Sequence, residues 1–231
     1  MIREAIVLAG GFGTRLQQVV SAVPKPMAPV AGKPFLQYML DYLISHKVNH
    51  AVLAVGYLHE TIINFFGDKY ESLDITYSIE SNPLGTGGGI LQACNYVNGN
   101  NVFVINGDTF FDVDLVELSA LHEHHHALLT VALKKMKRFD RYGTVDLDAN
   151  GRISGFVEKK YLDEGLINGG IYCLNKKIFH TELPAVFSFE KEILEKEIVN
   201  RKIYGLLSEG YFIDIGIPED FARAQDEFKG K

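Results

Sequence analysis

Short apolar runs that alternate with helical patterns are the feature of this sequence that most constrains its fold. Runs typical of buried strands occupy residues 5–8, 51–55, 75–79 and 102–105. Apolar residues at helical spacing lie between them, at residues 34–46, 60–66 and 89–97, and Gly67 ends the second of these helices. Strand–helix–strand repetition of this kind predicts a mostly parallel central sheet with helices on both faces.

The second half of the chain changes character. Strand-like runs at residues 128–133, 143–147, 153–158 and 169–174 follow one another with little helix between the first three. Asn150-Gly151 is a hairpin turn signal, and helices are expected at residues 190–199 and 219–228. We therefore expect a smaller antiparallel or mixed extension of the sheet. No linker-like stretch interrupts the sequence, so residues 1–231 are expected to form a single α/β domain.

Composition and charge exclude several classes of protein. With 47% hydrophobic residues in 231, the chain can bury a large core and is not disordered. A net charge of −6 argues against a surface that coats nucleic acid, and it means that an anionic substrate must be met by local positive groups or a metal ion. No apolar run approaches the roughly 20 residues that span a bilayer, and the first apolar run is too short for a secretory signal. Cys94 and Cys173 have no metal-ligand spacing. We expect a soluble, cytoplasmic protein that binds no membrane; a homo-oligomer is left open.

A glycine-rich loop follows the first predicted strand, in the segment "VLAGGFGTRL" at residues 7–16. Glycines let backbone N–H groups converge on phosphate oxygens, and Arg15 adds a fork suited to bidentate phosphate contact. Two familiar phosphate motifs do not fit, because Leu16 stands where a dinucleotide fingerprint needs glycine and Pro34 follows Gly32-Lys33 where a P-loop needs Ser or Thr. The alternative is a turn that is rich in glycine for steric reasons alone.

A lysine between two prolines follows ten residues after Arg15, in "VPKPM". Pro26 disfavours helical backbone at Lys25, so we expect an extended, stiffened segment that holds the ammonium in place. An ammonium fixed near a phosphoryl centre would stabilise charge that develops during transfer. A surface lysine in a proline-rich turn is the alternative.

Together these motifs resemble the sugar-1-phosphate nucleotidyltransferase family. The resemblance rests on G-G-x-G-T-R-L and P-K-P-M, then on "PLGTGGG" (residues 83–89), "NGD" (106–108), "EK" (158–159), "NGGIY" (168–172) and "DIG" (214–216), in that order along the chain. It implies a Rossmann-like fold that joins a nucleoside triphosphate to a sugar 1-phosphate and releases pyrophosphate. The acceptor phosphate is already an anionic nucleophile, so in-line attack needs no covalent intermediate and no general base.

The resemblance also implies roles for particular residues. Residues 1–110 would mainly bind nucleotide and residues 111–231 mainly sugar phosphate. Arg15 and Lys25 would be catalytic, and Asp108 and Asp214, each at the end of a strand, would hold one Mg²⁺. The nucleotide would contact Leu8, Ala9, Gly10, Gly11, Gly13, Thr14, Arg15, Glu80, Pro83, Gly85, Thr86 and Asp108. The sugar phosphate would contact Gly107, Gly143, Glu158, Lys159, Asn168, Gly169 and Gly170. A helix cap or turn carboxylate is the alternative for either aspartate alone.

Glu80 bears on the choice of nucleobase. A carboxylate can accept hydrogen bonds from both N1–H and the 2-amino group of guanine, whereas the other bases offer fewer donors on that edge. If Glu80 faces the base, GTP is the expected donor, because a mismatched base would leave the carboxylate underpaired. A solvated glutamate at the end of a strand is the alternative.

Within the family, four segments look most like the D-glycero-α-D-manno-heptose 1-phosphate guanylyltransferases: "VPKPMAPVAGKPFL", "DYLISH", "AVGYLHE" and "PLGTGGGI". Thymidylyltransferases usually read K-Q-L-L-P where this chain has residues 25–29, and the longer mannose-specific enzymes carry a further β-helical domain. Compact uridylyltransferases are the nearest rival. A catalytically idle regulatory subunit predicts loss of Lys25 or an aspartate, and all three are present.

The tract His122–His126 is the one biased segment of the sequence. His122 and His126 would share a helical face and could chelate a metal ion. Since no carboxylate or cysteine cluster supports such a site, we expect a solvated helix end.

Overall fold

A computed structural model describes residues 2–11, 23–157, 161–179, 182–198 and 202–230. Its helices are α1 (Phe35–Ser45), α2 (His59–Phe66), α3 (Gly85–Ala93), α4 (Leu115–His124) and α5 (Pro218–Glu227), with 3₁₀ turns at Lys25–Met27, Cys94–Tyr96 and Lys176–Ile178 and a π-helix at Glu190–Glu195. Its strands are β1 (Glu4–Leu8), β2 (Pro29–Val30), β3 (Lys33–Pro34), β4 (His50–Val55), β5 (Lys69–Tyr70), β6 (Leu73–Ile79), β7 (Asn101–Asn106), β8 (Thr109–Phe111), β9 (Leu129–Phe139), β10 (Thr144–Leu147), β11 (Ile153–Val157), β12 (Leu162–Asn175), β13 (Ile203–Leu207) and β14 (Phe212–Asp214).

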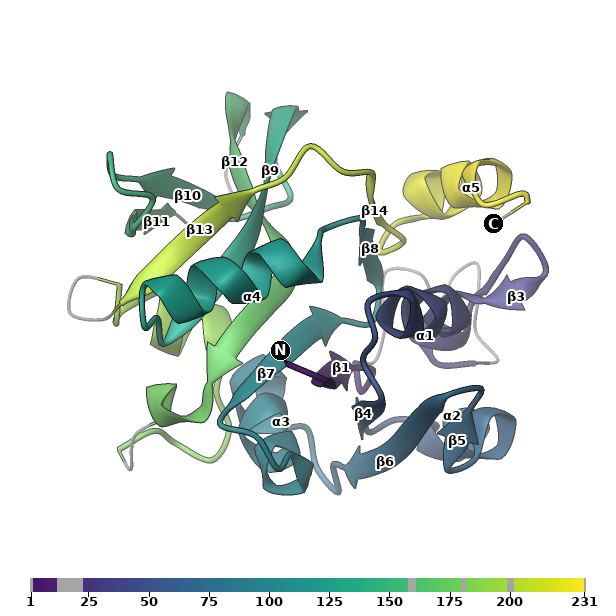
Figure 1. Ribbon diagram of the computed structural model, residues 1–231. Helices are drawn as coiled ribbons and strands as arrows, with labels where there is room; N and C mark the ends of the chain where they lie inside the picture. The colour runs from purple at the N-terminus through teal and green to yellow at the C-terminus, as the bar shows by residue number, and fades with distance from the viewer. Residues whose placement is uncertain (1, 12–22, 158–160, 180–181, 199–201, 231) are drawn as a thin grey trace.

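One mixed sheet runs through the molecule in the order β11-β10-β12-β7-β1-β4-β6-β5, with β9 and β13 joined to it through β12 (Figure 1). Strands β7, β1, β4 and β6 are parallel neighbours. Strand β12 then pairs antiparallel with β7 and β9. The predicted mostly parallel sheet with an antiparallel or mixed extension is confirmed. Strands β8 and β14 form a separate two-stranded ladder, which lies between α4 and α1 in the view of Figure 1.

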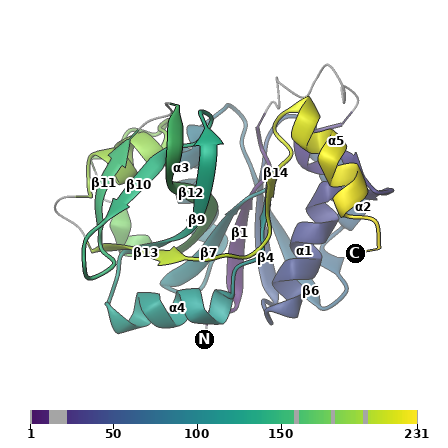
Figure 2. The same cartoon turned by 90° about the horizontal axis from the view of Figure 1, so that it is seen from above.

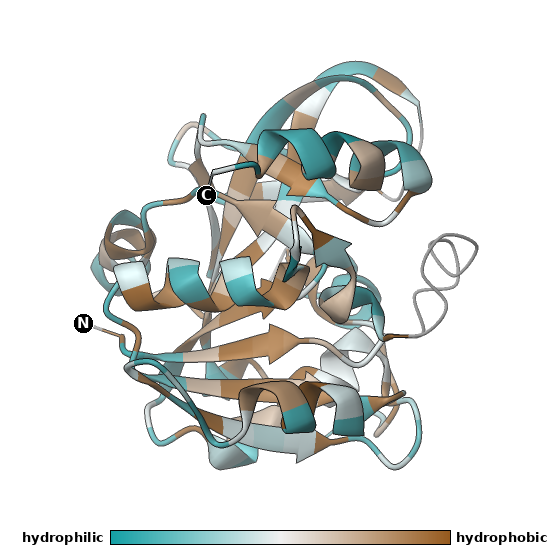
Figure 3. Cartoon of the chain, turned by 90° about the vertical axis from the view of Figure 1, so that its right-hand side faces the viewer, coloured by the Kyte–Doolittle hydropathy of each residue, from teal (hydrophilic) through white to brown (hydrophobic). Residues whose placement is uncertain are grey.

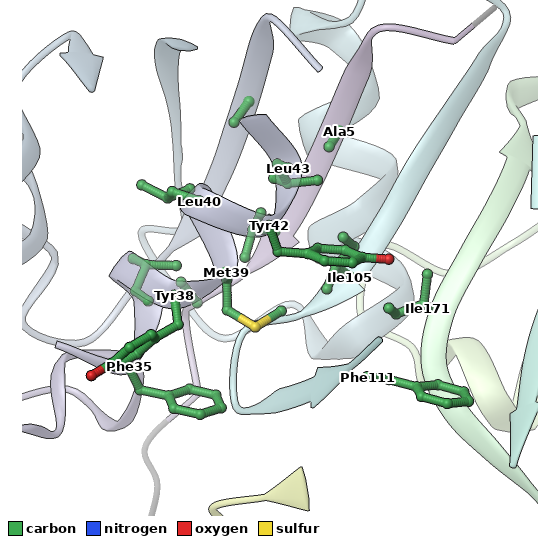
Figure 4. Packing of buried hydrophobic residues seen from close by; sticks show 14 of the residues in the cluster. Ala5, Phe35, Tyr38, Met39, Leu40, Tyr42, Leu43, Ile105, Phe111 and Ile171 are labelled. Carbon is green, nitrogen blue, oxygen red and sulfur yellow. The ribbon is translucent and has the colours of Figure 1, made fainter. Parts of the chain in front are cut away.

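Alternation along the parallel strands explains why helices cover both faces. Ala5 and Val7 of β1 belong to the same buried cluster as helix α1, whereas Ile6 belongs to the cluster that contains α3. Figure 4 shows α1 side chains packed beside Ala5 and Ile105, and Figure 3 shows the apolar strands lying between more polar helices. Among the described residues, no helix is long and apolar enough to span a membrane.

Several elements differ from the predictions. Strands β9 and β12 are longer than expected, with 11 and 14 residues, because they continue past the core as a paired ribbon. Helix α3 begins at Gly85 rather than at residue 89, since tight packing of its glycines outweighs their poor helix propensity. The helix predicted at residues 190–199 is a π-helix at Glu190–Glu195. The hairpin at Asn150-Gly151 is confirmed, with Gly151 at φ 75° between β10 and β11.

The histidine tract is only in part the solvated helix end that we expected: Glu123, His124 and His126 are exposed, whereas His122 is buried. Helix α4 ends at His124, and His126 adopts φ 46°, so His122 and His126 do not continue one helical face. His122 is 1% exposed, and its Nδ1 lies 3.0 Å from Thr130 Oγ1. Burial lowers the pKa of His122 to about 4, which keeps the ring neutral. Within the described ranges, no cluster of three metal-ligating side chains is present.

Candidate active site

A cavity of about 730 Å³ opens where the parallel strands β1, β6 and β7 end. This is the edge at which open α/β sheets usually bind ligands. Its lining comes from both halves of the chain and includes most of the predicted site residues: Leu8, Gly10, Gly11, Lys25, Glu80, Pro83, Gly85, Thr86, Asp108, Gly143, Asn168, Gly169, Gly170 and Asp214. Ala9 and Gly107 lie beside it without lining it. Gly13, Thr14, Arg15, Glu158 and Lys159 lie outside the described residues.

Lys25, Asp108 and Asp214 come together in the cavity wall. The Lys25 ammonium donates to Asp108 Oδ2, and its Nζ lies 3.8 Å from Asp214 Oδ1. Both carboxylates therefore lie next to one positive group, although they come from opposite halves of the sequence. A carboxylate pair that converges on one point suits a divalent cation, whose remaining ligands would be water and phosphate oxygens.

The environment of Asp214 opposes its negative charge. Burial raises the pKa of this carboxyl, and the neighbouring charge of Asp108 raises it further. Lys25, the Gly216 N–H and Arg141 act in the opposite direction, with Gly216 N donating to Oδ1 at 2.7 Å. Among the described residues, the positive groups near Asp108 and Asp214 do not offset the mutual repulsion of the two carboxylates. A bound cation would relieve this repulsion.

The β8–β14 ladder fixes the two aspartates relative to each other. Asp214 pairs with Thr109 in the ladder, and Ile215 N donates to the Asp108 carbonyl at 3.0 Å. The adjoining Gly107 donates its N–H to Leu8 O at 2.9 Å. A Cβ on Gly107 would lie 2.5 Å from that oxygen, so only glycine permits this approach of β7's end to β1.

Lys25 does not lie in the extended segment that we expected. Residues Lys25–Met27 form one 3₁₀ turn, in which Ala28 N donates to Lys25 O at 3.0 Å. Proline lacks an N–H, so its place in this first turn costs no hydrogen bond. Burial of Pro26 and Met27 against the core accounts for the turn and keeps the ammonium in the cavity.

The glycine loop follows the end of β1, and its described part lies beside Glu80. A Cβ on Gly10 would lie 3.2 Å from both Gly56 N and Glu80 Oε1. Among the described residues, no atom lies within 4 Å of where a Cβ on Gly11 would be, and Gly11 lines the cavity. Close packing thus favours glycine at position 10, and the bare backbone at position 11 is accessible to a ligand.

Glu80 follows strand β6 and is half-buried in the cavity wall. Its Oε2 accepts a hydrogen bond from Leu84 N at 3.0 Å, which holds the turn before α3. Among the described residues, Oε1 accepts no hydrogen bond, and it lies 2.8 Å from where a Cβ on Gly89 would be. Glu80 is therefore not a freely solvated glutamate, and one of its oxygens is still available to a ligand.

The glycines of "PLGTGGG" are explained first by a protein contact. Gly85 adopts φ 73°, and a Cβ there would lie 2.5 Å from Phe187 O. Gly87 N donates to the same carbonyl at 2.9 Å, and Phe187 N donates to Leu84 O at 2.9 Å. The resemblance implies that the nucleotide contacts Gly85 and Thr86, and both line the cavity. The close approach to these glycines in the structure, however, is that of residues 185–187.

The opposite wall is formed by Gly143 and the "NGG" segment of β12. Asn168 Nδ2 donates to Tyr172 Oη at 2.7 Å, while its Oδ1 accepts from Gly170 N at 3.0 Å. Gly170 adopts φ 75°, where the register between β12 and β9 shifts. This irregularity turns backbone groups of the segment out of the ladder, so that they line the cavity.

Sequence reasoning missed several residues that line the cavity: Asn106, Arg141, Tyr142, Ser188, Glu190, Lys191, Phe212 and Gly216. Arg141 and Tyr142 directly precede Gly143, so proximity to a predicted site residue was an available signal. Glu190 had none, because it lies in a segment whose pattern predicts an ordinary helix. Its Oε2 accepts from Thr86 Oγ1 and Ser188 Oγ, each at 2.8 Å.

Comparisons with known proteins agree with this geometry. The chain is 51% identical over 227 residues to D-glycero-alpha-D-manno-heptose 1-phosphate guanylyltransferase from Aneurinibacillus thermoaerophilus, covering 98% of each chain. It is 45% identical to the protein of the same name from Campylobacter jejuni, covering 94% of this chain and 96% of the other. The crystal structure of HddC from Yersinia pseudotuberculosis has a TM-score of 0.89 and 35% identity, covering 98% of this chain and 100% of that one, and HddC has also been solved complexed with GMP-PN.

The match to a family model covers nearly the whole chain. Residues 4–230 match the model described as nucleotidyl transferase. This range includes the glycine loop, Lys25 and both aspartates, and thus every group that meets in the cavity. The chain belongs to the nucleotidyl transferase family, as its motifs predicted.

Proposed function

We propose that this protein transfers GMP from GTP to a sugar 1-phosphate, D-glycero-α-D-manno-heptose 1-phosphate, and releases pyrophosphate. One observation carries the proposal: Lys25, Asp108 and Asp214 meet in a cavity that Glu80 and Asn168 also line. A cavity with a charged centre between two polar walls suits two substrates that react through phosphate. The named heptose 1-phosphate guanylyltransferases at 45% and 51% identity support the same choice of substrates.

The division of labour follows the two halves of the chain. The nucleotide would occupy the wall built by residues 1–110, with Gly10 and Gly11 against its phosphates and the base near Glu80 and Gly85. The sugar phosphate would occupy the wall built by residues 111–231, against Gly143 and residues 168–170. Arg15, Glu158 and Lys159 keep the phosphate- and sugar-binding roles proposed from the sequence.

Mg²⁺ fits the carboxylate pair. Asp108 and Asp214 supply hard oxygen ligands, and the pKa of Asp214 is raised by burial and by the charge of Asp108, both of which a bound cation would offset. When bound, the ion would neutralise phosphate charge and orient the phosphate groups. Two protein carboxylates leave the other positions to water and substrate, which is typical of magnesium sites that bind phosphates.

The chain's own groups provide positioning and charge. An oxygen of the acceptor phosphate attacks the α-phosphorus of GTP; a new P–O bond forms while the bond to the pyrophosphate oxygen breaks on the opposite side. No proton has to leave the nucleophile. The Lys25 ammonium lies where negative charge spreads over the transferred group, and the glycine-loop backbone holds the triphosphate in line.

Both buried cysteines are free thiols, which supports a cytoplasmic location.

Pyrophosphate release tests this function. The protein is incubated with MgCl₂, each of the four nucleoside triphosphates and a panel of hexose and heptose 1-phosphates. We expect release with GTP and the heptose 1-phosphate, and its loss in Lys25→Met and Asp108→Asn variants that remain folded by circular dichroism. Release with UTP or dTTP in place of GTP would refute the choice of base, and no release with any pair would refute the reaction.

A further inference from the structure

Arg141 places a cation in the cavity that no sequence motif singled out. It lies in the loop between β9 and β10, and its Nη2 donates to Asp220 Oδ2 at 2.5 Å, in the first turn of α5. Its side chain is 32% exposed and lines the cavity. The ion pair thus joins the β9–β13 part of the molecule to α5, which lies beside α1 on the other side (Figure 2). The ion pair with Asp220 holds the Arg141 guanidinium at the boundary between these two parts of the molecule.

Arg141 lines the same cavity as the carboxylate pair Asp108 and Asp214 and as the sugar wall. Two residues further on, Gly143 belongs to the opposite wall. A sugar 1-phosphate placed against that wall must direct its phosphate toward the carboxylate pair, because this phosphate attacks the nucleotide. That phosphate would therefore pass next to Arg141.

Because carboxylates outnumber cationic side chains in the described lining, an anionic substrate needs a positive group besides Lys25. The described lining holds three cationic side chains, Lys25, Arg141 and Lys191, and four carboxylates, Glu80, Asp108, Glu190 and Asp214. Lys25 already contacts two of those carboxylates. Arg141 carries five N–H donors, and among the described residues only its Nη2 donates, to Asp220 and to Tyr142 Oη at 3.5 Å. Donors therefore remain for a phosphate, in a planar fork that matches two of its oxygens.

We propose that Arg141 binds the phosphate of the sugar 1-phosphate, and that Asp220 holds the guanidinium in position for it. The proposal rests on the proposed function, since it names a further ligand of the same acceptor. Arg141 supplies charge and orientation for the nucleophile; Asp220 is a positioning residue that does not touch the substrate.

Arg223 provides a matched control. Its Nη1 lies 3.2 Å from Asp220 Oδ1, but its side chain is 50% exposed and does not line the cavity. Arg141→Gln and Arg223→Gln each remove one partner of Asp220, and only the first removes a charge from the cavity. Pyrophosphate release gives KM for GTP and for the sugar 1-phosphate, and the unphosphorylated sugar serves as a competitive inhibitor.

We expect Arg141→Gln to raise KM for the sugar 1-phosphate at least about tenfold, the loss of one charge-assisted contact. KM for GTP and Ki for the unphosphorylated sugar stay unchanged, and Arg141→Lys recovers part of the loss. Equal changes in both KM values, or a rise in Ki for the free sugar that matches the rise in KM, would mean that Arg141 only maintains structure. The same rise in KM for the sugar 1-phosphate in Arg223→Gln would also mean that Arg141 only maintains structure. An active wild-type enzyme with an unaffected Arg141→Gln variant refutes this inference alone, whereas a wild-type protein inactive on every sugar 1-phosphate refutes the proposed function and this inference with it.

Discussion

Glu80→Gln tests how the enzyme selects the nucleobase, because the two carboxylate oxygens of Glu80 have different roles in the structure. Oε2 accepts from Leu84 N, and a glutamine oxygen can keep that hydrogen bond. The other position then carries an NH₂ donor where Glu80 has its free Oε1. Guanine presents donors to this side chain, so a donor would meet a donor.

The cost follows from the bonds lost. A hydrogen bond to a charged group is worth about 1.5–3 kcal/mol, and an unpaired donor adds a similar penalty, so about 3 kcal/mol is a conservative sum. We therefore expect kcat/KM for GTP to fall on the order of a hundredfold, while the retained Leu84 bond leaves the melting temperature nearly unchanged. The assay is pyrophosphate release with each of the four triphosphates at a fixed concentration of sugar 1-phosphate. Glu60→Gln, an exposed substitution on α2, is the matched control. An unchanged preference for GTP in the Glu80→Gln variant would refute the reasoning.

Three further predictions concern the site and its support. In Gly107→Ala, the new Cβ would lie 2.5 Å from Leu8 O and push Asp108 out of place, so we expect kcat to fall at least about tenfold while the protein stays folded, measured by pyrophosphate release and circular dichroism. In Gly87→Ala, the added methyl would overlap the Phe187 ring, and urea unfolding should show a loss of about 1–3 kcal/mol; the double variant with Phe187→Leu should recover part of it, and strictly additive losses would count against the contact. His122 has a folded-state pKa of about 4, below its unfolded value near 6.5, so the unfolded state binds more protons between these pH values, and the free energy of unfolding falls as pH falls through this window, by up to about 3 kcal/mol. His122→Gln should lose this pH dependence in urea titrations from pH 4 to 7, and an equally steep dependence in the variant would contradict the assignment.

The elements whose pattern reflects the core could be predicted from the sequence. Strands β1, β4, β6 and β7 and helices α1 and α5 lie within a residue or two of their expected bounds, because burial on one or both faces imposes their apolar spacing. Strands β8 and β13 were not predicted. Their pairing depends on distant segments rather than on local pattern, as the parallel pairing of β13 with β9 illustrates.

The residues of the candidate site also fall into those that the sequence predicts and those that it does not. Lys25, Asp108 and Asp214 could be proposed from motifs, and the structure brings them together. Glu190 could not, since it enters the cavity through a tertiary contact with Thr86 that leaves no local trace. For Arg141 the one local signal was its proximity to Gly143, and its contact with Asp220 is tertiary. Lys25 illustrates the limit of local rules: Pro26 disfavours helical backbone before it, and burial of the turn outweighs this preference.

The β8–β14 ladder also affects when the enzyme becomes active during its synthesis. Asp108 leaves the ribosome well before its partner strand β14, which lies much further along the chain. A chain that stops between them can bury much of the parallel sheet and still lack the second carboxylate. Such nascent or prematurely terminated chains are therefore expected to consume no nucleotide, because the proposed catalytic centre is incomplete until β14 docks.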